Sequence, residues 1–111
     1  MDIHEQAQGA VMVLKPQGPL VQADAEQFRT RMLEVLGRSL GRVIVDASAV
    51  PFVDSVGLEA LADVSEEMSR GGQALKLCGA NETVREVLEI TDLASQFEHF
   101  EDMLTAVRSF L

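Results

Sequence analysis

An acidic residue and a hydroxyl stand side by side at Asp54-Ser55, where an apolar strand pattern gives way to a helical one. The strand pattern is centred on Val43-Ile44-Val45, and from Leu58 onward apolar residues recur at helical spacing as far as Gly71-Gly72. We therefore expect Ser55 at or beside the N-cap of this helix, where its oxygen can accept an unpaired backbone N–H.

The chemistry that this position favours is phosphorylation. A phosphate on the Ser55 oxygen would lie at the positive end of the helix dipole and would present new negative charge to any partner. From the residues alone, two interpretations stay open for each side chain. Ser55 is either a helix cap or a phosphorylation site, and Asp54 is either a turn former and second capping acceptor or a participant in phosphoryl transfer.

Catalysis by a serine nucleophile finds no support in the sequence. Such a serine needs an activating base that is oriented by a third group. The Ser55 segment lacks the Gly-x-Ser-x-Gly elbow, and no sequence argument brings His4 or His99 to it. The histidines show no metal-ligand spacing, and no Gly-x-x-x-x-Gly-Lys phosphate cradle is present. We expect a protein that is not an enzyme and that holds neither a metal nor a cofactor.

Composition narrows the classes of partner. The net charge of −9 argues against direct binding to nucleic acid and against adsorption to anionic lipid. No apolar run approaches the roughly 20 residues that cross a bilayer, and the chain shows no signal peptide. The single cysteine, Cys78, cannot form an internal disulfide. These features predict a cytoplasmic location and an inert, buried Cys78 thiol.

Strand and helix patterns alternate along the 111 residues, a length that fits one domain. Short, largely apolar strand patterns are found at 10–14, 42–46 and 74–78, with an edge strand around Ile3 and a last short strand at 97–100. Helical patterns follow them at 24–40, 55–70, 81–90 and 103–111, the first with a capping box from Asp24 and Gln27. The strands at 42–46 and 74–78 form a βαβ unit with the helix between them, which predicts that they are parallel.

This order of elements, together with several short motifs, resembles the STAS family, which includes the bacterial anti-sigma factor antagonists. The motifs are Val43-Ile44-Val45-Asp46, Val53-Asp54-Ser55-Val56-Gly57-Leu58, Gly71-Gly72, Leu88-Glu89-Ile90-Thr91 and Leu93. The resemblance extends from about Val11 onward. It implies a single α/β domain over residues 1–111, with a mixed sheet of four or five strands and about four helices mainly on one face.

The resemblance also implies a function for the Ser55 segment. Ser55 matches the serine that is phosphorylated by an anti-sigma factor, itself a serine kinase of the histidine-kinase-like ATPase type. The unphosphorylated antagonist binds this kinase and frees a sigma factor, and the phosphorylated form releases the kinase. A serine phosphatase is a further implied partner. The implied partner-binding residues are Asp54, Ser55, Val56, Gly57, Leu58 and Glu59.

Two positions depart from the family pattern. Val56 stands where many members carry a second Ser or Thr, which removes an alternative acceptor. Val21 stands where members often have Asp, and losing that partner contact bears on the sigma-factor pathway but not on the fold. Family members also serve as cytoplasmic accessory subunits of lipid-transporting ATP-binding cassette systems and as components of stress-signalling scaffolds, and both remain alternatives.

Two further features of this helix allow more than one interpretation. Glu59, Asp63, Glu66 and Glu67 form either a solvated face or a surface for a basic partner. Gly57 is either a close-packing position or part of the partner-facing first turn. We expect a bulky replacement such as Gly57→Trp to disrupt partner binding more than the fold, because packed interfaces tolerate little added volume.

Overall fold

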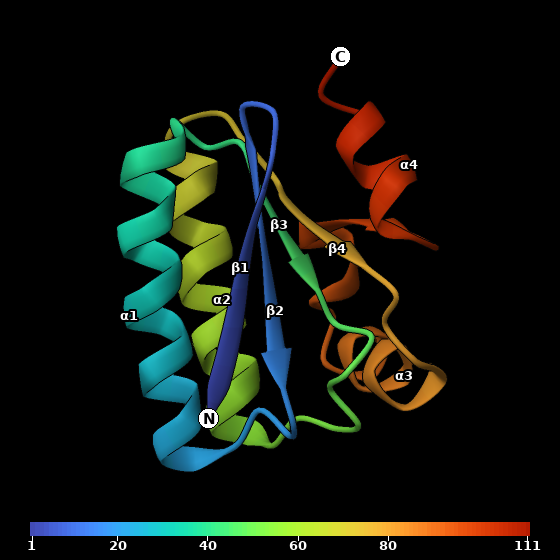
Figure 1. Ribbon diagram of the computed structural model, residues 1–111. Helices are drawn as coiled ribbons and strands as arrows, with labels where there is room; N and C mark the ends of the chain where they lie inside the picture. Colours follow the sequence, from blue (N-terminus) through green and yellow to red (C-terminus); the bar gives the residue numbers. More distant parts are fainter.

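A mixed five-stranded sheet forms the centre of the molecule in the computed structural model, which describes all residues from 1 to 111 (Figure 1). The strands lie in chain order across the sheet: β1 (Asp2–Gln8), β2 (Val11–Gln17), β3 (Val43–Asp46), β4 (Leu75–Cys78) and β5 (Phe97–Phe100). β1 is antiparallel to β2, and every other neighbouring pair is parallel. The predicted parallel pairing of the strands on either side of the second helix is therefore confirmed.

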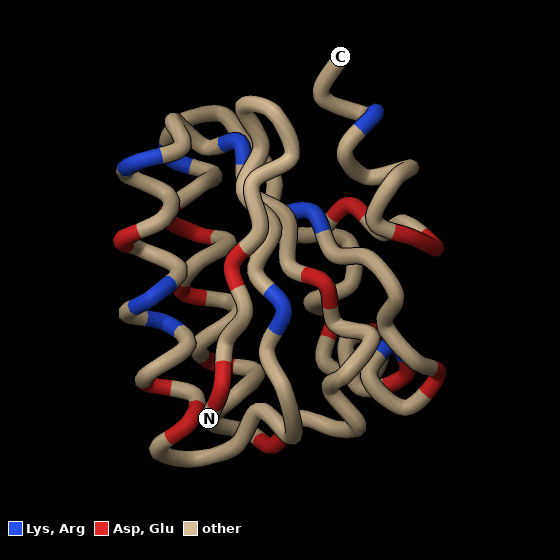
Figure 2. Tube along the Cα trace, viewed as in Figure 1, with Lys and Arg blue, Asp and Glu red and all other residues tan.

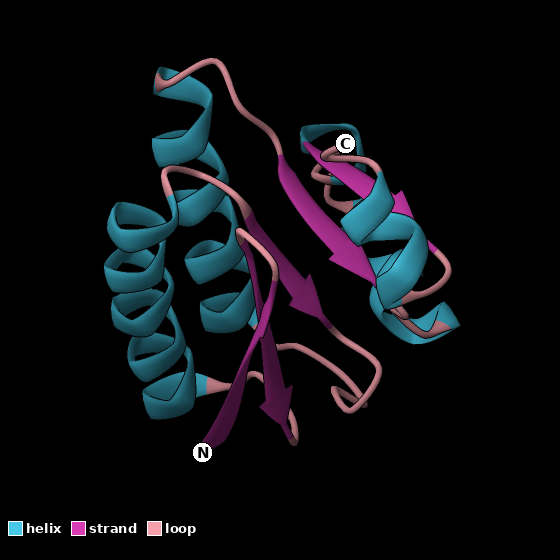
Figure 3. Cartoon of the chain, turned by 45° about the horizontal axis from the view of Figure 1, so that its top comes forward, coloured by secondary structure: helices cyan, strands magenta, loops and turns pink.

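Four helices cover the sheet: α1 (Gln22–Ser39), α2 (Ser55–Arg70), α3 (Glu82–Ile90) and α4 (Met103–Arg108). A short 3-10 turn, η1 (Ala94–Gln96), precedes β5. α1 and α2 lie side by side on one face, and α3 contributes to the same core, whereas α4 packs on the opposite face (Figures 1 and 3). The expected arrangement, with the helices mainly on one face, is confirmed, and α4 is the exception.

The two hydrophobic clusters explain why β3 has three apolar residues in a row. Val43 and Val45 of β3 point into the large cluster beneath α1, α2 and α3. Ile44, between them, belongs to the smaller cluster beneath α4. Successive side chains of a strand alternate between faces, so a strand covered on both faces has apolar residues at every position.

The start of α1 differs from the prediction. The expected capping box of Asp24 and Gln27 is wrong, because the helix begins two residues earlier, with Val21 at the N-cap and no side-chain cap. Both side chains instead bind the chain's first residue: the Met1 amino group lies 3.3 Å from Asp24 Oδ1 and donates to Gln27 Oε1 at 3.1 Å. Met1, which directly precedes the edge strand β1, thus binds the two side chains that local sequence assigns to the helix cap.

The first inner strand is also longer than expected. β2 continues past Pro16 to Gln17, whereas the prediction ended it at Leu14. β3 pairs with β2 only as far as Leu14, so Pro16 lies where β2 has one partner strand. Proline is tolerated where a strand is paired on one side.

None of the helices is both long enough and apolar enough to span a membrane.

Candidate functional site

The Ser55 segment lies at the edge of the sheet where the parallel strands end. The loop after β3 runs from Ala47 to Asp54 and is held by the chain that leaves β2. The Leu20 N–H donates to the Phe52 carbonyl at 3.1 Å, and the Asp54 N–H donates to the Leu20 carbonyl at 3.2 Å. These bonds form a parallel bridge between Leu20 and Val53, so the backbone reaches Ser55 along a fixed path.

Asp54, rather than Ser55, caps the helix. Asp54 has extended backbone angles, and its Oδ1 accepts the Gly57 N–H at 2.8 Å, which is the usual geometry of an N-cap. Ser55 is the first residue of α2, beside the cap, as one of the two predicted placements required. Its predicted capping bond is absent: the exposed Ser55 hydroxyl makes no hydrogen bond within the protein. It is therefore open to a reagent or an enzyme from solution.

The second carboxylate oxygen of Asp54 reaches the other long helix. Asp54 Oδ2 accepts the Gln22 N–H at 3.2 Å, and Gln22 is the first residue of α1. The starts of α1 and α2 therefore meet at a single side chain, at the lower end of both helices in Figure 1. Local sequence patterns do not predict this contact, since its partners lie 32 positions apart in the chain.

Gly57 is a close-packing position. It is buried in the first turn of α2, and a Cβ atom there would overlap the carbonyl oxygen of Leu20. The helix can approach the chain leaving β2 this closely because residue 57 has no side chain. The structure therefore argues against the expectation that Gly57→Trp would disrupt partner binding more than the fold, because the missing side chain makes room for internal backbone and not for a partner.

The remaining predicted partner-binding residues differ in how far they reach solvent. Ser55, Val56 and Glu59 are exposed, whereas Asp54 and Leu58 are half-buried. Phe52, which is not among the predicted site residues, is 48% exposed just ahead of the segment. Together with Val56, it places two exposed apolar side chains within four residues of each other on either side of Asp54-Ser55. The signal available in the sequence was a large apolar residue next to Pro51 in a loop without periodicity.

Three of the four acidic side chains on this face of α2 form ion pairs within the molecule. Arg70 pairs with Glu66 and Glu67, and Arg29 of α1 lies 3.4 Å from Asp63. Glu59 alone among the four acidic residues has no ion pair. Figure 2 shows acidic and basic positions alternating along α1, which faces them. Of these four carboxylates, Glu59 is the one free for a cation on a partner.

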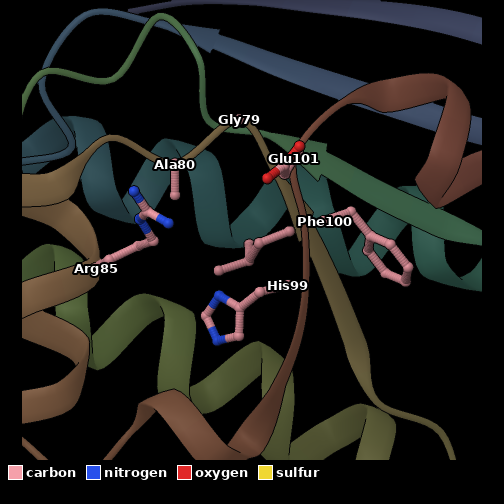
Figure 4. Close-up of a pocket in the computed structure, with 7 residues that line it drawn as sticks. Gly79, Ala80, Arg85, His99, Phe100 and Glu101 are labelled. Carbon is pink, nitrogen blue, oxygen red and sulfur yellow. The ribbon is translucent and has the colours of Figure 1, made fainter.

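A separate hollow of about 320 Å³ lies at the ends of β4 and β5 (Figure 4). Arg85 from α3 and His99 from β5 point into the same space, below Ala80 in this view, and Leu77 also lines the hollow. His99 Nε2 lies 2.9 Å from the Ala94 carbonyl and so donates to it. None of the residues that line this hollow belongs to the Ser55 segment.

The one cysteine is chemically quiet, as the sequence predicts. Cys78 ends β4 and is buried beneath α4. Burial, and then the nearby carboxylates of Asp46 and Asp102, raise the pKa of the Cys78 thiol to about 12. Since the thiolate is the reactive form, this group is inert at neutral pH.

Comparison with known proteins identifies the family. The STAS domain model matches residues 2–106, and the chain belongs to that family. The Bordetella bronchiseptica protein named "Putative anti-sigma factor antagonist BtrV" is 30% identical over 81 residues, which cover 73% of this chain and 70% of that protein. "Probable sulfate transporter Rv1739c" of Mycobacterium tuberculosis is 30% identical over 106 residues, which cover 90% of this chain but 19% of the transporter.

Solved structures share the fold at lower identity. A Thermotoga maritima protein described as a "putative anti-sigma factor antagonist" superposes with a TM-score of 0.87 at 21% identity, covering 96% of this chain and 92% of that one. The Bacillus cell fate determinant SpoIIAA in its phosphorylated form gives a TM-score of 0.72 at 17% identity, covering 97% and 99%. The mixed sheet and its helices are thus the STAS arrangement.

Proposed function

We propose that this protein is a phospho-regulated binding module of the anti-sigma factor antagonist type. In its unphosphorylated form it binds an anti-sigma factor that is also a serine kinase of the histidine-kinase-like ATPase type. Phosphorylation of Ser55 by that kinase releases the complex, and a serine phosphatase restores the binding form. The observation that carries the proposal is the exposed, unbonded Ser55 hydroxyl, which directly follows the capping residue of α2.

The backbone around Ser55 suits a phosphate. The first four N–H groups of a helix have no partner inside it. Here the Gly57 N–H binds the Asp54 side chain and the Leu58 N–H binds the Asp54 carbonyl, which leaves the N–H groups of Ser55 and Val56 without an acceptor. A phosphate on Ser55 would lie beside these two donors and the positive end of the helix dipole. The modified state would therefore be tolerated by the fold.

The release step follows from the surface around the serine. Ser55, Val56 and Glu59 contact the kinase directly, while Asp54, Gly57 and Leu58 hold the start of α2 in place. Val56 and Phe52 add exposed apolar area close to Ser55 in the chain. A phosphate carries a charge of about −1.5 to −2 at neutral pH, and docking an apolar surface over it requires its desolvation. The modification therefore weakens the complex without unfolding the module.

A second candidate function is service to a membrane transporter. The match to a stretch of a sulfate transporter favours it, because that stretch spans nearly the whole of this chain. In this case the module docks on a transporter, such as the cytoplasmic ATPase of a lipid-transporting system, instead of on an anti-sigma factor. A role in a stress-signalling scaffold is a third use of the same surface. Neighbouring genes that encode a small ATPase and a sigma factor, or a transporter, separate these functions.

Affinity capture from the native cytoplasm tests the proposal. Wild type, Ser55→Ala and Ser55→Asp serve as baits, and phosphopeptide mapping of the native protein runs alongside. We expect phosphate at Ser55, a small ATPase retained by wild type and Ser55→Ala, and its loss with Ser55→Asp. Dominant modification at Ser48, Ser65 or Thr91, or equal capture by all three baits, would contradict the switch. Recovery of transporter subunits would favour the second function.

A further inference from the structure

Asp54 has every polar atom engaged inside the protein. Its backbone N–H donates to the Leu20 carbonyl at 3.2 Å, and its own carbonyl accepts the Leu58 N–H at 2.9 Å. One carboxylate oxygen accepts the Gly57 N–H at 2.8 Å, and the other accepts the Gln22 N–H at 3.2 Å. Both carboxylate oxygens are thus engaged at the junction of two helices.

The Gln22 end of this junction is held in an unfavourable conformation. Gln22 has a φ of 44°, in the left-handed region that residues other than glycine, asparagine and aspartate seldom occupy. Val21, at the N-cap of α1, offers no side-chain cap. The contact that binds the Gln22 N–H is the carboxylate of Asp54. The start of α1 therefore depends on a side chain supplied by the start of α2.

We propose that Asp54 is a positioning residue that fixes the start of α1 against the start of α2, so that Ser55 meets its kinase as part of one rigid surface. The inference rests on the proposed function of Ser55 and assigns Asp54 a role different from partner contact or phosphoryl transfer. Ser55 follows Asp54 directly, and the exposed Gln22 and Ala23 of α1 are held beside it by the same carboxylate. Loosening the junction would let these neighbours move relative to Ser55.

One substitution separates the two bonds of the carboxylate. Asp54→Asn keeps an oxygen for the Gly57 N–H, and asparagine is as good an N-cap as aspartate. Its NH₂ group, however, cannot accept the Gln22 N–H and places a donor opposite a donor. The variant therefore keeps the cap of α2 and loses the link to α1. Asp63→Asn, farther along α2, removes the same charge without touching the junction and is the matched control.

Amide hydrogen exchange on the full chain tests the junction itself. We expect the Gln22 amide to exchange at least tenfold faster in Asp54→Asn than in wild type or Asp63→Asn, while the Gly57 amide keeps its rate. An unchanged Gln22 rate would overturn the proposal. Faster exchange at both amides would reduce Asp54 to an ordinary helix cap and would overturn it as well. This measurement needs no kinase and stands apart from the proposed function.

Phosphorylation kinetics test the positioning role, using the ATPase recovered by the capture experiment with Mg-ATP. We expect Asp54→Asn to raise the KM for the protein substrate about tenfold and to change kcat less. The same change should cost less in a Gln22→Gly background, because glycine adopts a φ of 44° without strain and no longer needs the carboxylate.

The double-mutant cycle of these two changes then decides between the roles of Asp54. Additive effects would mean that Asp54 contacts the kinase itself, and they would overturn the positioning role. Wild type that is not phosphorylated at all would remove the proposed function and the positioning role together. The exchange rates would still decide whether the junction exists.

Discussion

The starts of α2 and α4 have the same capping bond but differ in the tertiary contacts around it. Asp54 and Asp102 each accept the N–H three residues later at 2.8 Å. Asp102 is exposed and makes no side-chain hydrogen bond outside its own helix start, whereas Asp54 also binds the beginning of α1. The third residue of the turn is Thr105 in α4 and the buried Gly57 in α2. The same cap thus starts a peripheral helix in one place and joins two helices in the other.

This difference indicates where a regulated serine can be placed. Ser55 follows a cap whose surroundings are set by tertiary contacts, so modifying it changes a surface that is otherwise fixed. The residue after Asp102 is Met103, which packs against the small cluster beneath α4. An identical capping bond therefore says nothing of function by itself. The function depends on what the next residue faces and on what the cap is tied to.

The largest expected effect tests the third residue of each turn. Gly57→Trp should unfold the domain or cost more than about 3 kcal/mol, because the side chain would overlap the Leu20 backbone. Thr105→Trp places the same bulk on an exposed position and should cost well under half as much. Urea denaturation of both variants measures the free energies of unfolding. Equal losses would show that the two helix starts are packed alike.

The next effect concerns binding. Ser55→Asp should weaken the complex with the captured kinase about a hundredfold, equivalent to roughly 3 kcal/mol. Its effect on stability should stay below about 1 kcal/mol, because a carboxylate at a helix start interacts favourably with the dipole. Isothermal calorimetry and thermal melts measure the two quantities, with Ser55→Ala as the neutral control. Wild-type affinity in a folded Ser55→Asp variant would remove the switch.

A smaller effect tests how α4 is attached. α2 is held by close backbone approach, whereas the α4 region is held by side chains around Lys76. The Lys76 ammonium bonds Glu98 and Ser109 at 2.8 Å and lies 4.4 Å from the centre of the Phe110 ring. Lys76→Ala should cost about 1–2 kcal/mol in unfolding free energy through these lost contacts. Lys15 is half-buried and makes no ion pair, so Lys15→Ala in the same measurement should change little.

The smallest effect concerns how the α4 cap contributes to stability as the pH changes. The Thr105 backbone N–H, and then its hydroxyl, hold the pKa of Asp102 below its usual 3.8. A carboxylate with a lowered pKa in the folded state adds stability above the unfolded pKa, and that stability is lost as the pH falls through the folded value. Melting temperatures from pH 6 down to pH 2.5 should therefore fall less steeply in Asp102→Asn than in wild type. Parallel plots of melting temperature against pH for the two proteins would show that Asp102 adds no pH-dependent stability.

Much of the fold follows from local sequence pattern. The exceptions arise where residues far apart in the chain contact each other. The apolar periods predict the inner strands and α2, and asparagine at 81 correctly predicts the cap of α3, whose Val84 N–H it accepts. Asp24 is misassigned because the Met1 amino group competes for it. The inward position of Gly57 depends on where the Leu20 carbonyl passes, and no helical period contains that information.

In the candidate site, too, some features follow from local sequence and others depend on long-range contacts. Placing Ser55 at a helix start needs only the change from strand to helix pattern and an acidic neighbour. Assigning the cap to Asp54 instead of Ser55 needs the backbone angles, since both residue types cap helices well. The bond from Asp54 to Gln22 crosses 32 residues and arises because two helices begin at the same sheet edge. Neither hydrophobic periodicity nor the capping preferences of single residues predict such a contact.

The quiet Cys78 thiol has a practical consequence for anyone who wishes to watch this surface at work. A maleimide dye reacts with thiolates, and the only native thiol is buried with a pKa of about 12. The chain therefore behaves toward such dyes as if it carried no cysteine. A cysteine introduced at exposed Ala23, next to the start of α1, would take a single label without altering the core. Its fluorescence would report a docking kinase, or a loosened helix start, in real time.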